Sequence, residues 1–284
     1  ASFPSDAVHA SRCPGAARAS SGRMNCAARA AVATMVSRDR PGSLTVLRVY
    51  LLGRFRVRGD DAPPVPQGVR APRRPLQLLQ AIAVLGPRDA AFARVAAALW
   101  PDADGDAAAA AAGIALHRLR RLLGNQRAIT LQNGRVGLDP ALVWVDCEAF
   151  EARADAVERG ADMDALAQAL ALYAGPLLAD AEDHAWLLPA RERLRSRYVR
   201  LVVHGARLLE QARRSGAAIE TLQRALEHEP LAEALHRALI TAYARAGRAA
   251  EAQEAYRRCA RLLRELLGVA PAPETQRALR GARA

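Results

Sequence analysis

The side chains best suited to chemistry are basic, and they cluster between residues 117 and 121. His117, Arg118, Arg120 and Arg121 stand close together there, within a segment that is expected to form a helix over residues 107–123. Guanidinium groups donate hydrogen bonds to phosphates and guanine edges, and a helix that exposes them can enter the major groove. The pattern therefore predicts DNA binding. The alternative is a solvated amphipathic helix in a chain that is rich in arginine throughout.

Three further arginines are candidates for contacts with DNA. Arg73 and Arg74 precede the first expected helix, where side chains and backbone amides can hold a phosphate. Arg135 follows the expected turn Asn133-Gly134, from which a basic side chain can reach a groove or the DNA backbone. For each of the three, the alternative is an arginine that is merely exposed.

The residues give no support for catalysis or metal binding. The chain lacks the GxSxG and GxxxxGK[ST] motifs, and its four cysteines lack the spacing of metal ligands. Asp102, Asp104 and Asp106 resemble the start of a calcium loop, but the glycine and glutamate that such a loop requires are missing. We expect these acids to cap a helix instead. The sequence predicts no enzyme, no cofactor and no metal site.

The charge balance agrees with a polyanionic partner. The 284 residues carry a net charge of +12, and all 41 basic residues are arginine. Residues 41–150 hold 14 arginines against 9 acidic residues, so the region with the candidate ligands is basic. The absence of lysine and the richness in alanine together indicate a bias toward GC-rich codons. Part of the positive charge therefore reflects this biased composition. Because no stretch of about 18 residues is apolar and uncharged, we expect no membrane span. The four cysteines are scattered, as reduced thiols in the cytosol would be, so we expect a cytoplasmic protein.

The elements around the candidate ligands follow the order of strands, helices and a hairpin. Residues 44–52 and 55–58 are β-rich, and a third, weaker strand is expected around Pro63 to Pro66. Asn133-Gly134 predicts a tight hairpin over residues 129–138. The expected helices cover residues 75–85, 94–99 and 107–123. This order is typical of a winged helix-turn-helix, with 107–123 as the recognition helix and 129–138 as the wing.

After Pro140 the pattern becomes helical almost to the C-terminus. Gly216 and Gly247 are expected to punctuate two helix-turn-helix units about 31 residues apart, near the tetratricopeptide period of about 34. The expected helices cover residues 147–158, 162–173, 184–213, 217–228, 231–246, 248–267 and 273–281, and the length of 184–213 leaves a break within it open. The predicted fold is mainly α: a winged helix-turn-helix with a small β-sheet and a wing hairpin, then an all-α tetratricopeptide-like helical-repeat domain.

Residues 1–43 have a different texture from the rest of the chain. They are rich in Ala, Ser, Arg and Gly, and they lack both a sustained apolar period and the apolar core of a signal peptide. We expect a disordered tail or sequence upstream of the natural start, with Met35 as a candidate start.

Two families resemble successive parts of the chain. Residues 44–140 resemble the OmpR/PhoB-type winged helix-turn-helix DNA-binding domain of SARP-type activators, through Leu51 to Val57 (LLGRFRV), Val95 to Pro101 (VAAALWP) and Ile114 to Gly124 (IALHRLRRLLG). Residues 143–280 resemble the bacterial transcriptional activator domain, through Val143 to Phe150 (VWVDCEAF), Leu172 to Leu178 (LYAGPLL), Trp186 to Leu194 (WLLPARERL), Pro230 to Leu235 (PLAEAL) and Leu267 to Thr275 (LGVAPAPET).

This resemblance implies a DNA-binding transcription regulator, and an activator in particular. It implies binding to repeats in promoter DNA, often by two protomers side by side, and contact with RNA polymerase. The helical domain would then mediate protein contacts. The expected recognition helix departs from the family pattern at its start: Ala107 to Ala112 are six consecutive alanines, which offer few groups to read bases. The alternative is therefore a protein-interaction adaptor with a degenerate winged helix that no longer reads DNA sequence.

Overall fold

The computed structural model describes residues 47–59, 72–160 and 162–281. The chain divides into two units, Ala1–Pro41 and Gly42–Ala284, and all described residues belong to the second. The tail expected over residues 1–43, including Met35, and the weak strand around Pro63 to Pro66 lie outside the described residues. In the described part, no helix has both the length and the apolar character needed to cross a membrane.

The first strands form a sheet with a strand from much later in the chain. β1 (Leu47–Tyr50) pairs antiparallel with β2 (Arg56–Gly59), as their alternating apolar residues predict. On its other edge β1 pairs in parallel with β6 (Val143–Val145), which gives the strand order β2-β1-β6. The sequence did not predict β6, which lies in the segment where the second resemblance begins.

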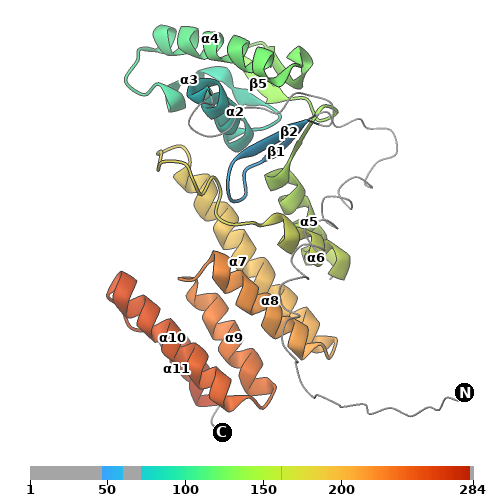
Figure 1. Cartoon of the computed structure of the whole chain (residues 1–284), viewed down its shortest axis with the longest axis vertical. Coiled ribbons are helices and arrows are strands. Elements are labelled where there is room, and N and C mark those ends of the chain that lie inside the picture. The colour runs from blue at the N-terminus through green and yellow to red at the C-terminus, as the bar shows by residue number, and fades with distance from the viewer. Residues whose placement is uncertain (1–46, 60–71, 161, 282–284) are drawn as a thin grey trace, which may run out of the picture. The chain divides into compact units, whose positions relative to one another are not determined.

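Three helices follow, and the third is the expected recognition helix. They are α2 (Arg73–Leu85), α3 (Phe92–Leu99) and α4 (Gly105–Leu123). The Asp104 side chain accepts a hydrogen bond from the Ala107 amide at 2.7 Å, which confirms a helix-capping role for this acid. Figure 1 shows α4 lying across α2 and α3, and both of these helices pack against it.

The expected wing is present directly after α4. A short 3-10 helix, η2 (Gln126–Ala128), leads into β4 (Ile129–Gln132) and β5 (Arg135–Leu138), and the two-residue strand β3 (Ala90–Ala91) completes the order β3-β5-β4. Asn133 and Gly134 have φ angles of 50° and 72°. Both central residues of a type I′ turn need positive φ, so this dipeptide closes the hairpin at the predicted place.

The remainder of the chain is helical, as predicted. The helices are α5 (Asp146–Gly160), α6 (Met163–Leu172), α7 (Leu188–Gln211), α8 (Ser215–His228), α9 (Glu233–Arg245), α10 (Ala249–Leu267) and α11 (Pro273–Gly281). α7 begins at Leu188 rather than at residue 184, and it continues to Gln211 without the break that its length left open. α8 packs between α7 and α9, and α10 packs on the other side of α9 (Figure 1).

The repeat period differs from the predicted one. Gly216 lies in the first turn of α8 and does not form the turn between units. Arg213, with φ of 59°, occupies that turn and corresponds to Gly247, with φ of 71°, between α9 and α10. The next amides confirm the match: Arg214 donates to the Leu209 carbonyl at 2.8 Å, and Arg248 donates to that of Tyr243 at 2.9 Å. From Arg213 to Gly247 the period is 34 residues, the tetratricopeptide length.

The winged-helix segment and the helical segment share backbone pairing. Asp146, the first residue of α5, is 1% exposed, and its carboxylate accepts hydrogen bonds of 2.8 Å from the Leu51 and Leu52 amides. The Leu178 amide donates to the Leu51 carbonyl at 2.7 Å, and the Ala179 amide donates to that of Gly53 at 2.8 Å. The end of β1 is therefore held by residues from the helical half of the chain.

Candidate nucleic-acid interface

The helix α4 has one face in the core and one face in solvent. The buried face consists of Ala108, Ala112, Ala115, Leu116, Leu119 and Leu123. Leu122 is half-buried and packs against the edge of this core. The exposed face of α4, as the name is used below, consists of Ala110, Gly113, Ile114, His117, Arg118 and Arg121.

The alanine run at the start of α4 has a packing role. Ala108 and Ala112 are buried against Ala96 of α3, and Phe92 and Trp100 cover this small cluster. Methyl side chains at these positions let the two helices approach closely, and a larger residue would overpack the contact. The alanines therefore position α4 on α3, and the groups that could read DNA lie farther along the helix.

His117, Arg118 and Arg121 have free polar groups. All three are exposed, and none forms a hydrogen bond or an ion pair within the part of the chain that the structure describes. Residues three and four positions apart are neighbours on a helix surface, so these side chains form one basic patch. They are placed as predicted, with their donors available to a ligand.

Arg120 lies on a different side of α4 from this patch. Its Nη2 donates to the Ile129 carbonyl at 2.9 Å, and its Nε is buried without a partner. The prediction grouped Arg120 with the exposed residues, but a step of 100° per residue turns it away from Arg118 and Arg121 toward the wing. Arg120 therefore fastens the first wing strand to α4.

Arg135 lies on the wing, as predicted, but it is already paired. Its Nη2 donates to the Asp89 carbonyl at 2.6 Å, and its Nε forms an ion pair with the Asp89 carboxylate. The hydrogen bond and the charge of Asp89 raise the pKa of Arg135. Half of the Arg135 side chain stays exposed, at 52%, so a phosphate could share it.

Arg73 and Arg74 also have partners within the protein. Arg73 forms an ion pair of 2.6 Å with Glu182, and both side chains are about 70% exposed. Arg74 donates to the Leu99 carbonyl at 3.1 Å, and its guanidinium carbon lies 5.6 Å from the centre of the Trp100 ring. Both arginines are therefore already engaged within the protein.

Two exposed arginines lie near the patch and were not among the predicted ligands. Arg94 is exposed on α3, which packs against α4, and Arg127 is exposed in η2, between α4 and the wing. Neither forms a hydrogen bond through its side chain among the described residues. Both occupy polar positions just outside the apolar pattern of their elements, and this is the signal that could have identified them.

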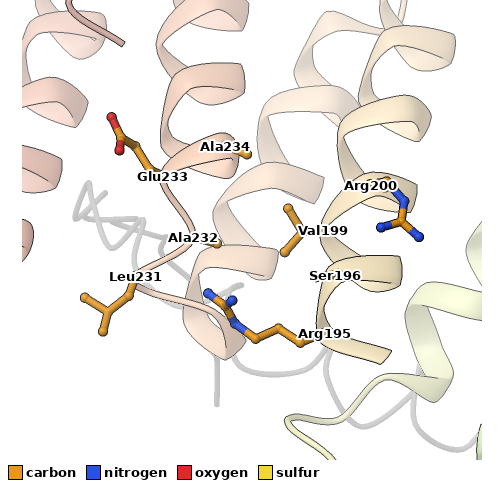
Figure 2. Close-up of a pocket in the computed structure, with 8 residues that line it drawn as sticks. All are labelled: Arg195, Ser196, Val199, Arg200, Leu231, Ala232, Glu233 and Ala234. Atoms are coloured by element: carbon orange, nitrogen blue, oxygen red, sulfur yellow. The ribbon is translucent and has the colours of Figure 1, made fainter. Parts of the chain in front are cut away.

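The helical segment contains a buried polar cluster beside an open pocket. Glu229 is 5% exposed; it accepts hydrogen bonds from the Tyr173 hydroxyl and from Nε of Arg195, each at 2.8 Å. Burial raises the pKa of Tyr173, and Glu229 raises it further. The pocket, of about 300 Å³, lies between α7 and the start of α9, where Arg195 extends toward Leu231 (Figure 2). Glu229 neutralises Arg195, and the pocket is also lined by the charged residues Arg200 and Glu233.

The comparisons with known proteins agree with this architecture. Residues 145–281 match the family described as "Bacterial transcriptional activator domain". The chain is similar in structure to Mycobacterium tuberculosis EmbR in complex with a low affinity phosphopeptide, with a TM-score of 0.62 and 24% identity. That match covers 84% of this chain and 65% of the EmbR chain, so this chain spans less than two thirds of the solved one. No curated protein matches the sequence. The likeness confirms the predicted fold class.

Proposed function

We propose that this chain binds double-stranded promoter DNA. Its residues 145–281 belong to the bacterial transcriptional activator domains, and its architecture is that of a SARP-type transcriptional regulator. Recognition helix α4 enters the major groove, and the β4–β5 wing contacts the neighbouring groove or backbone. The bound protein activates transcription. The domain limits we propose are 44–140 for DNA binding and 143–280 for the helical domain, with β6 contributing to the sheet of the first.

The observation that carries this proposal is the basic patch of His117, Arg118 and Arg121. A winged helix that served only as a scaffold would have no need for three unpaired basic side chains on the exposed face of its third helix. Phosphates and guanine edges satisfy such donors. The alanine run favoured an adaptor without sequence reading, but two of its members, Ala108 and Ala112, pack against α3, so these two have a structural reason to be small.

The remaining predicted ligands fit secondary roles. Arg135, Arg94 and Arg127 are exposed near α4 and can contact phosphates on either side of the groove. Arg73 and Arg74 would have to give up Glu182 and the Leu99 carbonyl before they could reach DNA. We therefore assign the main DNA contacts to α4.

The helical domain would mediate protein contacts in this scheme. We propose RNA polymerase as its partner, together with a second protomer bound to an adjacent repeat. Electron microscopy of the protein with polymerase on promoter DNA would test both contacts.

Fluorescence anisotropy on DNA selected from a random pool tests the proposal. The double variant Arg118→Ala/Arg121→Ala should bind the selected DNA at least about 30-fold more weakly, since each of the two lost contacts is worth about 1–3 kcal/mol. If the residues contact phosphate, the salt dependence should also fall, by about 0.9 in log–log slope for each phosphate that the variant no longer neutralises. Arg258→Ala/Arg261→Ala removes two exposed arginines with the same spacing from α10 and should bind like the unmodified chain.

The same experiment can contradict the proposal. Selection that enriches no sequence, with equally weak binding of scrambled DNA by all three proteins, would reject sequence-specific DNA binding. The adaptor alternative would then be the better explanation.

A further inference from the structure

One residue on the exposed face of α4 is apolar and large. Ile114 is 56% exposed, the most exposed large hydrophobic side chain in the described part of the winged helix. It contributes to neither hydrophobic core cluster. It lies one turn before His117 and Arg118, so it belongs to the same surface as the basic patch. Packing within the chain therefore does not explain an isoleucine at this position.

The residue before it is equally unexplained by the fold. Gly113 is in the middle of α4, where glycine destabilises a helix relative to alanine. A Cβ atom added at Gly113 would meet nothing within 4 Å. Neither a tight helix contact nor an unusual backbone conformation requires glycine here. A helix surface without a side chain allows another molecule to come close to the backbone.

We propose that Gly113 and Ile114 contact the C5-methyl group of a thymine in the major groove, and that Ile114 determines specificity at that base pair. This inference rests on the proposed DNA-binding function. The thymine methyl is the apolar group that bases display in the major groove, and apolar side chains recognise it. Gly113 lets the helix approach the groove closely, and Ile114 then covers the methyl group.

The neighbouring residues favour DNA over a protein partner for this surface. His117, Arg118 and Arg121 continue the same face, and no acidic residue of α4 after Asp106 offsets their charge. An apolar protein-binding surface would be larger, whereas Ile114 here is a single side chain within a basic surface. A negatively charged ligand that presents isolated methyl groups fits this combination.

Replacing thymine by uracil tests the contact, because only the C5-methyl group is removed. Each thymine of the selected DNA site is replaced in turn, and affinity is measured by anisotropy with the full chain. We expect one or two positions at which the unmodified protein binds uracil DNA about fourfold more weakly, the effect of one buried methyl group. Ile114→Ala should bind thymine DNA as weakly as the unmodified protein binds uracil DNA, and it should no longer distinguish the two. Leu266→Ala, an exposed leucine on α10, is the matched control and should keep the distinction.

A second variant separates binding from stability. Gly113→Ala should raise the melting temperature by about 2–4 °C, because alanine favours the helix. It should nevertheless weaken binding to the selected site at least threefold, because the new methyl group keeps α4 from the groove. Stabilisation without weaker binding would overturn the role of Gly113 in close approach.

The outcomes distinguish this inference from the proposed function. Tight, sequence-specific binding with no sensitivity to uracil at any position would reject the thymine contact and leave DNA recognition intact. Sensitivity to uracil that persists in Ile114→Ala would reject Ile114 as the reader. If selection enriches no DNA sequence, both proposals fail.

Discussion

Neighbouring arginines on α4 have different roles because of the direction in which each side chain points. Arg118 and Arg121 extend into solvent without partners among the described residues, whereas Arg120 donates to the wing at Ile129. The sequence segment His117 to Arg121 reads as a uniform basic cluster. The pitch of the helix divides it into a surface for a ligand and an attachment for the wing.

This division predicts different effects on stability. Arg120→Ala should lower the free energy of unfolding by about 1–2 kcal/mol, because it removes a charge-assisted hydrogen bond to the Ile129 carbonyl at a half-buried site. Arg121→Ala should leave it within about 0.5 kcal/mol, as for most surface substitutions. Urea denaturation followed by circular dichroism measures both. Equal stability of the two variants would mean that Arg120 does not fasten the wing.

At the scale of elements, the two turns of the helical repeat have the same backbone conformation but different residues. The α7–α8 turn and the α9–α10 turn both need a positive φ, which Arg213 provides at 59° and Gly247 at 71°. Glycine adopts this conformation without strain, whereas for a residue with a Cβ it costs about 1–2 kcal/mol. A search of the sequence for glycine therefore misses the first turn, which contains Arg213. The backbone conformation nevertheless repeats after 34 residues.

We predict opposite effects of substitution at the two turns. Arg213→Gly should raise the free energy of unfolding by about 1 kcal/mol, and Gly247→Ala should lower it by a similar amount. Gly216→Ala, three residues away within α8, is the control and should not destabilise the protein, because a Cβ there meets nothing within 4 Å. Thermal melts of the three variants give the comparison. If Gly216→Ala destabilised the protein and Arg213→Gly had no effect, Gly216 rather than Arg213 would be the residue that forms the turn.

At the scale of the whole molecule, one buried acid connects the two halves of the described chain. The Asp146 carboxylate accepts hydrogen bonds from the Leu51 and Leu52 amides, and β6 immediately before it pairs with β1. Burial raises the pKa of Asp146 to about 6, and the two amides oppose that rise by stabilising the charged form. Weakening this contact should therefore lower the stability of both halves.

This contact predicts a pH dependence with a defined sign. Because the pKa in the folded state lies above the value of about 4 in the unfolded chain, the folded protein retains a proton that the unfolded chain releases between about pH 4 and 6. The stabilisation from this group is present below about pH 4 and is lost as the pH rises through 6; it amounts to at most about 3 kcal/mol. The melting temperature of the unmodified chain minus that of Asp146→Asn should therefore fall over this range.

A substitution of an exposed aspartate is the control for that measurement. Asp102→Asn removes the charge of an exposed aspartate, and its melting temperature is compared with that of the unmodified chain at each pH. A difference for Asp146→Asn that is constant from pH 4 to 7 would contradict the assigned pKa.

The sequence by itself determined the types and the order of the helices α2 to α11 and of the strands β1, β2, β4 and β5. Local signals decide these features: β-rich composition indicated β1, alternation of apolar and basic residues indicated β2, and Asn133-Gly134 indicated the hairpin. Helical periodicity indicated α4 and the repeat helices. The composition and position of the basic cluster likewise pointed to DNA. The predictions of secondary structure succeed because each depends on residues that are close together in the chain.

Only the tertiary structure decided which side chains are free. Arg120, Arg135 and Arg73 meet partners up to 109 residues away, and β6 joins a strand from the far end of the winged helix. The turn at Arg213 was hidden because an arginine, rather than a glycine, holds the positive φ. Contacts between residues that are far apart in the chain depend on how the helices and strands pack together, so no short sequence pattern predicts them. The exposed face of α4, with Gly113, Ile114, Arg118 and Arg121, can therefore be identified only once the structure shows which side of the helix is buried in the core.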